Sequence, residues 1–343
     1  MNKLLILNYS MSRNNSIFAH QFEMASRLSA HFDRCLVLTP EKPFTEDQFE
    51  GEIRSYVWKP GRPLRGAVEF FFSFISALVR NKPSVIFSHM TEVQSALIAP
   101  VTRILGIDHY LWYAHASKSW YLRWCNFWCT GIITSTEGSC PIKGGKVSIV
   151  GQAIDLQSFA RRKFTYLENL RFVHVGRLDK SKGIREIIEV FLRHGSPDST
   201  LTFIGESRGL VSQNYIDKIR VDYCEEIESG KIIFVGKTAR AELPSLLSLF
   251  DIFVHSFQGS LDKAILEATS IGLPVVTINR EFIHEMDSWN SSTEINLDAE
   301  LKSFLEKSPD QMKSMVDNRI VKISQNHSLD EWASKVSAIL LNN

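Results

Sequence analysis

Short β-rich runs alternate with helical patterns along most of the chain, and this alternation constrains the fold more than any other feature. In the first half, strands are predicted at residues 4–7, 35–39, 84–88, 109–113, 131–134 and 147–150. Segments with the apolar period of amphipathic helices separate them, near residues 16–30, 64–79, 93–105 and 118–130. Because parallel strands need a crossover connection and a helix provides one, the pattern predicts βαβ units around a parallel sheet.

The alternation restarts after a polar stretch at residues 155–168, which has no apolar periodicity and is the best linker candidate. Strands are then predicted at 172–175, 201–204, 232–235, 252–255 and 275–278, with helices near 184–192, 216–227, 243–250 and 264–270. A chain of 343 residues is expected to form about two domains. We therefore predict an α/β chain with domains at 1–158 and 159–325, and a C-terminal helix at 326–343 that can pack back on the first domain.

Composition excludes several classes of protein. Hydrophobic residues make up 44% and charged residues 22% of the chain, as in soluble globular proteins. The formal net charge of +1 gives no basic field for nucleic acid, although the N-terminal half carries a mild positive excess. No apolar run reaches the roughly 20 residues of a membrane-spanning helix. Five scattered cysteines favour a reducing compartment, so we expect a cytoplasmic protein with buried thiols; the pair Cys125 and Cys129 could also bind metal.

One charged loop has the residues of a diphosphate site. Residues 174–183 read His-Val-Gly-Arg-Leu-Asp-Lys-Ser-Lys-Gly and lie between a predicted strand and a predicted helix. Gly176 permits close approach of a ligand to the backbone, Arg177 can bind two phosphate oxygens, and Lys182 supplies a point charge near a helix start. From spacing alone, a solvated charged loop is an equal alternative.

A second loop, at residues 256–263, leads from the strand at 252–255 into the next helix. Backbone amides at a helix start suit an anion or sugar hydroxyls. Glu267 lies one turn inside that helix on an otherwise apolar face, where a carboxylate needs a partner such as a ribose diol. An ordinary surface carboxylate is the alternative.

The order and spacing of these two segments resemble the retaining glycosyltransferases of family 4, also called glycosyl transferases group 1. That family has a Gly-Arg…Lys-Gly element for the donor diphosphate, matched here by residues 176–183, and a later Glu-x7-Glu element whose second Glu matches Glu267. Trp112-Tyr113-Ala114-His115, Val150 to Asp155 and Phe234-Val235-Gly236 extend the resemblance over essentially the whole chain. The resemblance implies the GT-B fold, in which two Rossmann-like, doubly wound domains face each other across a cleft.

The resemblance also implies roles for individual residues. Arg177 and Lys182 would neutralise the leaving diphosphate, and His115 would lie beside the transferred sugar, although a lone histidine is more often structural. His89 is a second cleft candidate, for the acceptor. The implied donor-binding residues are Gly176, Arg177, Lys182, Gly236, Ser260, Leu261, Asp262, Lys263 and Glu267.

Two positions depart from the family pattern. Gly259 stands where the first Glu of the later element would be, and Asp262 or Lys263 could take over its contact with the sugar. The first βα loop, which is often glycine-rich in the family, here offers Ser12, Asn14 and Asn15 as candidate acceptor contacts.

These observations together predict retaining transfer of a hexose-type sugar from a UDP- or GDP-linked donor to a glycan or lipid-linked acceptor, as in bacterial surface polysaccharide synthesis. No metal or other cofactor is expected, because no Asp-x-Asp motif ends a strand and two cations fill that role. Aromatic and basic residues near 62–80 and 118–130 suit peripheral contact with the inner face of a membrane, and an aromatic core is the alternative. The rival functions are a GT-B-like sugar-nucleotide epimerase and a catalytically silent sugar-nucleotide-binding protein.

Overall fold

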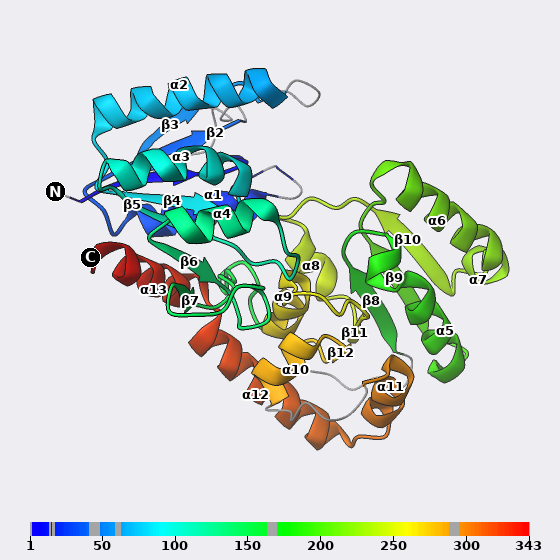
Figure 1. Cartoon of the computed structure of the whole chain (residues 1–343). Helices are drawn as coiled ribbons and strands as arrows, with labels where there is room; N and C mark the ends of the chain where they lie inside the picture. Colours follow the sequence, from blue (N-terminus) through cyan, green and yellow to red (C-terminus); the bar gives the residue numbers. More distant parts are fainter. Residues whose placement is uncertain are drawn as a thin grey trace. The chain divides into compact units, whose positions relative to one another are not determined.

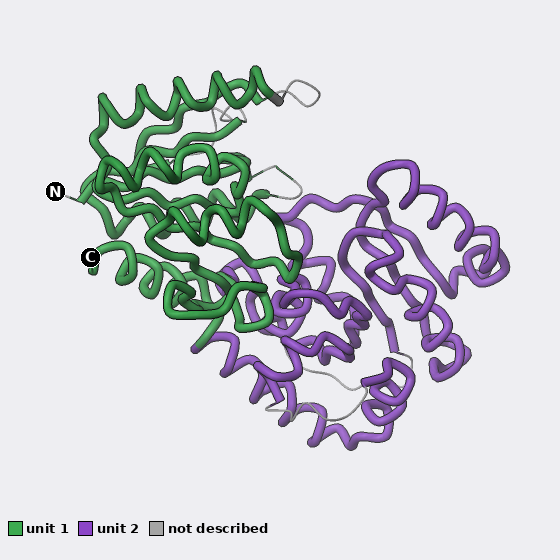
Figure 2. The backbone as a smooth tube through the Cα atoms, in the orientation of Figure 1, with its two compact units in different colours: residues 1–153, 326–343 green, residues 154–325 purple. Residues whose placement is uncertain are grey.

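The computed structural model describes residues 2–13, 15, 18–40, 49–58, 63–162, 170–287 and 295–342. The chain forms two compact units (Figure 1 and Figure 2): unit 1 is Met1–Ala153 with Asn326–Asn343, and unit 2 is Ile154–Gln325. The boundary after Ala153 falls a few residues before the predicted one, because Ile154 and Phe159 are buried in the core of unit 2. Part of the predicted linker, at 163–168, lies outside the described residues.

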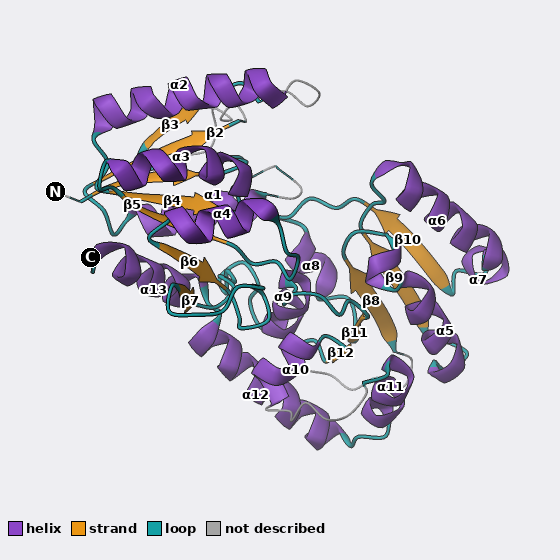
Figure 3. Ribbon diagram, viewed as in Figure 1, coloured by secondary structure: helices purple, strands orange, loops and turns teal. Residues whose placement is uncertain are grey.

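Unit 1 contains a seven-stranded parallel sheet between two layers of helices (Figure 3). The strand order is β3-β2-β1-β4-β5-β6-β7. The strands are β1 (Lys3–Leu7), β2 (Arg34–Thr39), β3 (Glu52–Ser55), β4 (Val85–His89), β5 (Asp108–Trp112), β6 (Gly131–Thr134) and β7 (Val147–Ile149). The helices are α1 (Ala19–Ser29), α2 (Pro63–Asn81), α3 (Glu92–Ile104), α4 (Trp120–Trp128) and α13 (Leu329–Leu341).

Alternation along β1 shows how unit 1 builds its two cores. Leu4 and Ile6 pack with Phe22 of α1 and Trp332 of α13, whereas Leu5 and Leu7 pack against α2 on the opposite face. Successive side chains of a strand point to opposite faces, so a fully apolar strand is buried on both. The C-terminal helix therefore belongs to the core of unit 1, with Trp332 fully buried.

Unit 2 repeats the plan with a five-stranded parallel sheet in the order β10-β9-β8-β11-β12. Its strands are β8 (Arg171–Val175), β9 (Thr200–Ile204), β10 (Ile232–Gly236), β11 (Ile252–His255) and β12 (Val275–Thr277). A 3₁₀ turn, η1 (Lys180–Lys182), precedes α5 (Ile184–His194). The other helices are α6 (Gly209–Asp222), α7 (Cys224–Glu228), α8 (Leu243–Leu247), α9 (Lys263–Ile271), α10 (Arg280–Asp287), α11 (Leu297–Leu305) and α12 (Pro309–Asn326).

Both sheets follow the doubly wound order, in which the first and fourth strands of the unit are neighbours and the chain changes direction between them. Ligands of such sheets bind at this switch point, beyond the carboxyl ends of the strands. In unit 1 it lies between β1 and β4, and in unit 2 between β8 and β11. The predicted doubly wound α/β architecture is confirmed in each unit.

The sequence patterns missed β3 and α10 and misjudged the bounds of α6 and α7. Strand β3 was not predicted, because it is a half-exposed edge strand whose sequence Glu-Ile-Arg-Ser has a single apolar residue. Helix α10 was also not predicted. The single helix predicted at 216–227 is wrong: α6 begins at Gly209, where its first turn exposes Leu210 and Val211, and the helix breaks at Tyr223 before α7.

Candidate functional site

Three glycines lie at the carboxyl ends of the adjacent strands β8, β9 and β10. The amide of Gly176 donates to the carbonyl of Ile204 (3.1 Å), and the amide of Gly205 donates to the carbonyl of Gly236 (2.9 Å). A Cβ added at Gly205 would lie 1.9 Å from the carbonyl oxygen of Gly176, so this approach requires glycine. The strands therefore end in a ledge of bare backbone that a ligand can approach closely. Sequence analysis identified Gly176 and Gly236 but missed Gly205, although Phe-Ile-Gly repeats the strand-then-glycine pattern.

Lys182 lies in η1 beside this ledge and is 7% exposed. Its ammonium forms an ion pair with Asp262 and lies 3.8 Å from the ring centre of Phe257. The next residue, Gly183, has φ +64° and would place a Cβ 2.4 Å from Oγ of Ser256, so the turn cannot accept a larger residue without a shift. The buried ammonium of Lys182 therefore lies near the carboxyl ends of β8 and β11.

Arg177 supplies a second cation, and it is exposed. Its side chain is 58% accessible, and Nη1 lies 3.7 Å from the carboxylate of Asp179. Asp179 is also engaged in capping η1 through the amide of Ser181 (2.9 Å). The guanidinium is therefore held only loosely and can reach an incoming anion.

Two buried histidines, His174 of β8 and His255 of β11, lie in the strands that form the switch point. Nδ1 of His174 lies 2.9 Å from the carbonyl of Val254, which fits a neutral ring, and burial together with the neighbouring His255 lowers the pKa of His174 to about 3. His255 lies between Thr277 (3.0 Å from Nδ1) and Asp262 (3.4 Å from Nε2), and burial lowers its pKa as well. Burial alone would raise the pKa of Asp262, but His255 and the charge of Lys182 lower it, so the carboxylate stays ionised.

The buried carboxylate of Glu267 has a protein partner that sequence analysis did not find. Arg240 forms an ion pair with Glu267 and lies 5.4 Å from the ring centre of Phe159. Lys263, at the first position of α9, lies near both groups; burial, with Arg240 adding to the effect, lowers the pKa of Lys263 to about 7. Moving a charged group from water into the protein interior costs free energy unless an opposite charge lies beside it. Each of Glu267 and Arg240 therefore needs the other to remain charged at this buried position.

The loop between β11 and α9 is fixed by Asn279, which was also missed. Nδ2 of this fully buried side chain lies 2.9 Å from the carbonyl oxygen of Phe257 and 3.3 Å from those of Gly259 and Ser260. Leu261 is buried in the core, and Asp262 caps α9 by accepting from the amide of Ala264 (3.2 Å). The predicted donor residues at 260–263 therefore lie on a preorganised loop. An Asn that follows the predicted strand at 275–278 is the signal that could have been used.

In unit 1, neutral polar groups gather at the switch point. Oε1 of Gln21 accepts from the amides of Tyr9 (2.9 Å) and Ser10 (3.1 Å), and Nε2 donates to the carbonyl of His89 (3.4 Å). His89 is buried, with its ring against Trp112 and Trp332. The neighbouring loop thus lies against the end of β4, and Gln21 was not predicted.

The other predicted acceptor residues fall on the loop after β1. Ser12 is buried, and its amide donates to Oγ of Ser10 (3.1 Å). The side chain of Asn15 accepts from the amide of Phe18 (2.9 Å), which places it at the start of α1 as a turn-stabilising residue. Asn14 lies outside the described residues.

The histidine predicted beside the sugar, His115, lies on the loop after β5 in unit 1. It is exposed, and its Nδ1 lies 3.3 Å from Oγ of Ser117. The hydroxyl of Tyr113 donates to the carbonyl of Ser117 (2.8 Å), so the loop is folded back on the end of β5. His115 therefore has a free face, and its catalytic role stays a prediction.

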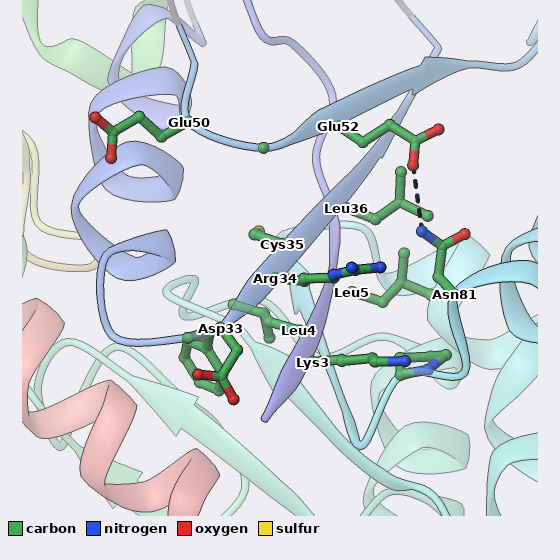
Figure 4. Close-up of a pocket in the computed structure, with 13 residues that line it drawn as sticks. Lys3, Leu4, Leu5, Asp33, Arg34, Cys35, Leu36, Glu50, Glu52 and Asn81 are labelled. Carbon is green, nitrogen blue, oxygen red and sulfur yellow. Dashed lines mark hydrogen bonds between the residues drawn. The ribbon is translucent and has the colours of Figure 1, made fainter. Parts of the chain in front are cut away.

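A pocket of about 370 Å³ opens at the amino ends of β1 and β2, away from the switch point (Figure 4). Charges of both signs line it, and Nδ2 of Asn81 donates to Glu52 across one side (3.2 Å). Its lining includes Lys3, Asp33, Arg34, Glu50, Glu52 and Asn81, none of which was predicted as a site residue. Because ligands of doubly wound sheets bind at the opposite end of the strands, we do not assign the function to this pocket.

The described residues also bear on metals and membranes. Among them, no group of three or more His, Cys, Asp or Glu side chains is placed to hold a metal ion. Cys125 and Cys129 are buried and unbridged. No helix in the part of the chain that the structure describes is both long and apolar enough to cross a membrane.

One family profile matches part of the chain, and several solved structures share its fold. Residues 169–295 match the sequence profile of the family Glycosyl transferases group 1, whereas no curated protein sequence matches the chain. HepE of Anabaena, solved with UDP, is similar in structure with a TM-score of 0.77, 14% identity and coverage of 99% of this chain and 100% of HepE. The complex of HepE with UDP-glucose has a TM-score of 0.76 and 15% sequence identity to this chain, with full coverage of both chains.

Two further solved structures agree. Sucrose-phosphate synthase of Thermosynechococcus elongatus has a TM-score of 0.78 at 11% identity, covering 99% of this chain and 98% of that one. The lipopolysaccharide outer core galactosyltransferase WaaB has a TM-score of 0.70 at 11% sequence identity, and the alignment covers both chains fully. The matched residues, 169–295, contain the glycine ledge, Arg177, Lys182, Asp262 and Glu267. The chain therefore has the GT-B fold, and its residues 169–295 match the family Glycosyl transferases group 1.

Proposed function

We propose that the chain is a retaining, metal-independent hexosyltransferase, with a UDP- or GDP-linked sugar as donor and a glycan or lipid-linked acceptor, acting in the synthesis of a bacterial surface polysaccharide. The observation that carries the proposal is the set of groups at the switch point of unit 2. A backbone ledge, a buried lysine and an exposed arginine come together there, which suits a diphosphate.

In this proposal Arg177 and Lys182 stabilise the negative charge that develops on the leaving diphosphate. Such preorganised charges are often the largest single contribution to catalysis. Lys182 is held by Asp262 before the donor arrives, so the diphosphate shares the ammonium with that carboxylate. The leaving phosphate oxygens take the acceptor proton, and the two cations fill the electrostatic role of a metal ion.

The donor and the acceptor are proposed to use different units. HepE was solved with UDP and with UDP-glucose, and this supports a nucleotide sugar as donor. The neutral polar side chains buried at the switch point of unit 1, Asn8, Ser10, Gln21 and His89, are of the kinds that bind the hydroxyls of a sugar acceptor. WaaB, a lipopolysaccharide outer core galactosyltransferase with the same fold, supports a role in surface polysaccharide synthesis.

A surface of unit 1 supports peripheral membrane contact. Helices α2, α3 and α4 pack in a row on one face of the sheet, and α2 and α4 expose large apolar side chains. We call these side chains the aromatic face; they are Leu64, Val68, Phe72 and Val79 of α2 and Trp120, Tyr121, Trp124 and Phe127 of α4. Phe72 is 69% and Phe127 is 71% exposed, which is unusual for phenylalanine. Arg65 and Arg80 of α2 and Arg123 of α4 are exposed as well, as expected for a partner with anionic lipid headgroups.

Liposome co-sedimentation tests this contact. Vesicles with anionic lipid should bind the protein at low salt, and the double variant Phe72→Ser, Phe127→Ser should lose binding. The matched control is Leu210→Ser, Val211→Ser, which changes two even more exposed apolar residues of unit 2 and should leave binding intact. Equal binding by both double variants would exclude the aromatic face.

Transfer and binding assays test the central proposal and its two rivals. The protein should release sugar from one donor of a UDP-, GDP- and ADP-sugar panel, form product only with acceptor, and do so in excess EDTA. NMR of the product should show the anomeric configuration of the donor. Isomerisation of the donor without acceptor would support an epimerase. Tight nucleotide binding with no turnover of any donor would support a silent binding protein.

A further inference from the structure

The ring of Phe257 fills the space where a side chain at position 259 would begin. A Cβ added at Gly259 would lie 2.1 Å from Cζ of Phe257 and within 2.8 Å of both Cε atoms. Real atoms do not approach so closely, so any other residue at 259 displaces the ring. The φ of Gly259 is not in the left-handed region, and so the backbone gives no separate reason for glycine. Glycine at 259 is therefore tied to the aromatic ring at 257.

The face of the same ring contacts the cation of the switch point. Nζ of Lys182 lies 3.8 Å from the ring centre, and the ring of His255 meets Phe257 edge-on at 6.2 Å. The other contact of the ammonium is the carboxylate of Asp262. The two contacts differ in kind: a carboxylate neutralises the ammonium, whereas an aromatic face stabilises it and leaves its charge in place.

The position of the ring is fixed by its backbone. Asn279 lies within hydrogen-bonding distance of the carbonyl oxygens of Phe257, Gly259 and Ser260, and its Oδ1 accepts from the amide of Phe282 at the start of α10 (2.9 Å). The backbone of the loop that carries the ring is thus hydrogen-bonded through Asn279 to the start of α10, and this holds the Cα of Phe257 in place near Lys182.

We propose that Phe257 is a positioning residue that holds the ammonium of Lys182 at the ends of β8 and β11, and that Gly259 is required because it makes room for the ring. The inference rests on the proposed function, in which Lys182 binds the donor diphosphate. Without the ring, Asp262 is the main contact of Lys182, and the carboxylate competes with the diphosphate for its charge.

Nucleotide affinity tests the role with conservative variants. With UDP and GDP as probes, Phe257→Leu should weaken binding about two- to fivefold, the size of one cation–π contact. Phe257→Tyr keeps an aromatic face and should restore affinity, and Gly259→Ala should act like Phe257→Leu. The control is Phe234→Leu, because Phe234 is also half-buried in unit 2 and lies 5.0 Å below the guanidinium of Arg220; it should leave affinity unchanged.

A double-mutant cycle decides whether Phe257 acts through Lys182. In the Lys182→Met background, Phe257→Leu should have no further effect on UDP affinity. An equal loss in both backgrounds would overturn the proposal, since a ring that merely packs the loop does not depend on the lysine.

Urea unfolding of the same four proteins separates this inference from the proposed function. The free-energy changes of the two substitutions should be less than additive, because each removes the same contact. Additive changes would overturn the positioning role, whatever the protein binds. Failure of the wild type to bind UDP, GDP or ADP would overturn the proposed function, and the stability cycle would still decide the contact.

Discussion

The switch points of the two units share one strand order and differ in charge. Between β1 and β4, unit 1 buries the neutral side chains of Asn8, Ser10, Gln21 and His89. Between β8 and β11, unit 2 places an ammonium and a carboxylate, with a second cation exposed beside them. Amides and hydroxyls suit sugar hydroxyls, whereas cations and bare backbone suit a diphosphate. The difference fits the proposal that unit 1 binds the acceptor and unit 2 the donor.

The largest expected effect comes from the cation of unit 2. Lys182→Met should weaken UDP or GDP binding about ten- to a hundredfold, because it removes a charged hydrogen-bond donor from the diphosphate. His89→Gln, at the end of β4 in the switch point of unit 1, should leave nucleotide affinity unchanged and lower transfer. Isothermal titration with UDP or GDP measures the nucleotide affinity of both variants, and a transfer assay measures their turnover. Nucleotide affinity that is lost in His89→Gln and kept in Lys182→Met would place the nucleotide in unit 1.

The Glu267–Arg240 pair should give the next effect. Glu267→Gln should weaken UDP binding about tenfold, if the carboxylate also contacts the ribose. Arg240→Gln should cost more stability than Glu267→Gln, about 2 against 1 kcal/mol, because Glu267 is more deeply buried than Arg240 and would be left without its partner. Urea unfolding measures the difference; a larger loss in Glu267→Gln would show that the pair is not held together by burial of the acid.

In unit 1, Gln21→Ala should affect the acceptor and not the donor. The substitution leaves the amides of Tyr9 and Ser10 without their acceptor, which should cost about 2 kcal/mol of stability. The loop loses its tie to β4, so the KM for the acceptor should rise several-fold while UDP affinity stays the same. Steady-state kinetics with varied acceptor and varied donor separate the two, and a change in the donor KM alone would contradict the assignment of units.

The smallest effect is a proton taken up on binding. Burial and Arg240 lower the pKa of Lys263 to about 7, so its ammonium is charged below that pH and mostly neutral above it. A diphosphate nearby favours the charged form and raises the pKa. Compared with Lys263→Arg, the wild type should therefore take up an extra part of a proton on UDP binding at about pH 8 and no extra proton at about pH 5.5, and the ratio of its affinity to that of the variant should fall as pH rises through 7.

Titration in buffers of different ionisation enthalpy measures this uptake. Lys263→Arg is the control, because arginine stays charged over the whole range. Equal proton uptake by the wild type and Lys263→Arg would rule out Lys263 as the group that titrates.

The sequence predicted the parts of the fold and site that depend on local pattern. Apolar alternation and helical periods are local signals, and they predicted most strands of both sheets. Gly176, Arg177 and Lys182 follow a strand directly, so the switch point could be predicted from their order. β3 and α6 were missed or misplaced because a half-exposed edge strand and a helix with exposed apolar residues lack clear periods.

The contacts that hold the site together were beyond the sequence. Gln21 reaches His89 across 68 positions, Arg240 reaches Glu267 across 27, and Asn279 reaches Phe257 across 22. Pairing over such separations follows from packing of the sheet and helices, which no local pattern encodes. Gly259 is the clearest case. In the sequence it stands where the family pattern has a carboxylate, whereas in the structure the ring of Phe257 occupies the space that a side chain at this position would need.

Hydrogen–deuterium exchange with and without saturating UDP tests most directly that unit 2 holds the nucleotide. We expect slower exchange of the backbone amides at 176–183, which run from Gly176 through the turn that carries Lys182. We expect the same at 257–263, the loop between β11 and the start of α9 that Asn279 holds in place. Exchange at residues 8–12 of unit 1 should not slow with nucleotide alone. Protection at 8–12 with no change at 176–183 and 257–263 would contradict the assignment of the donor site to unit 2.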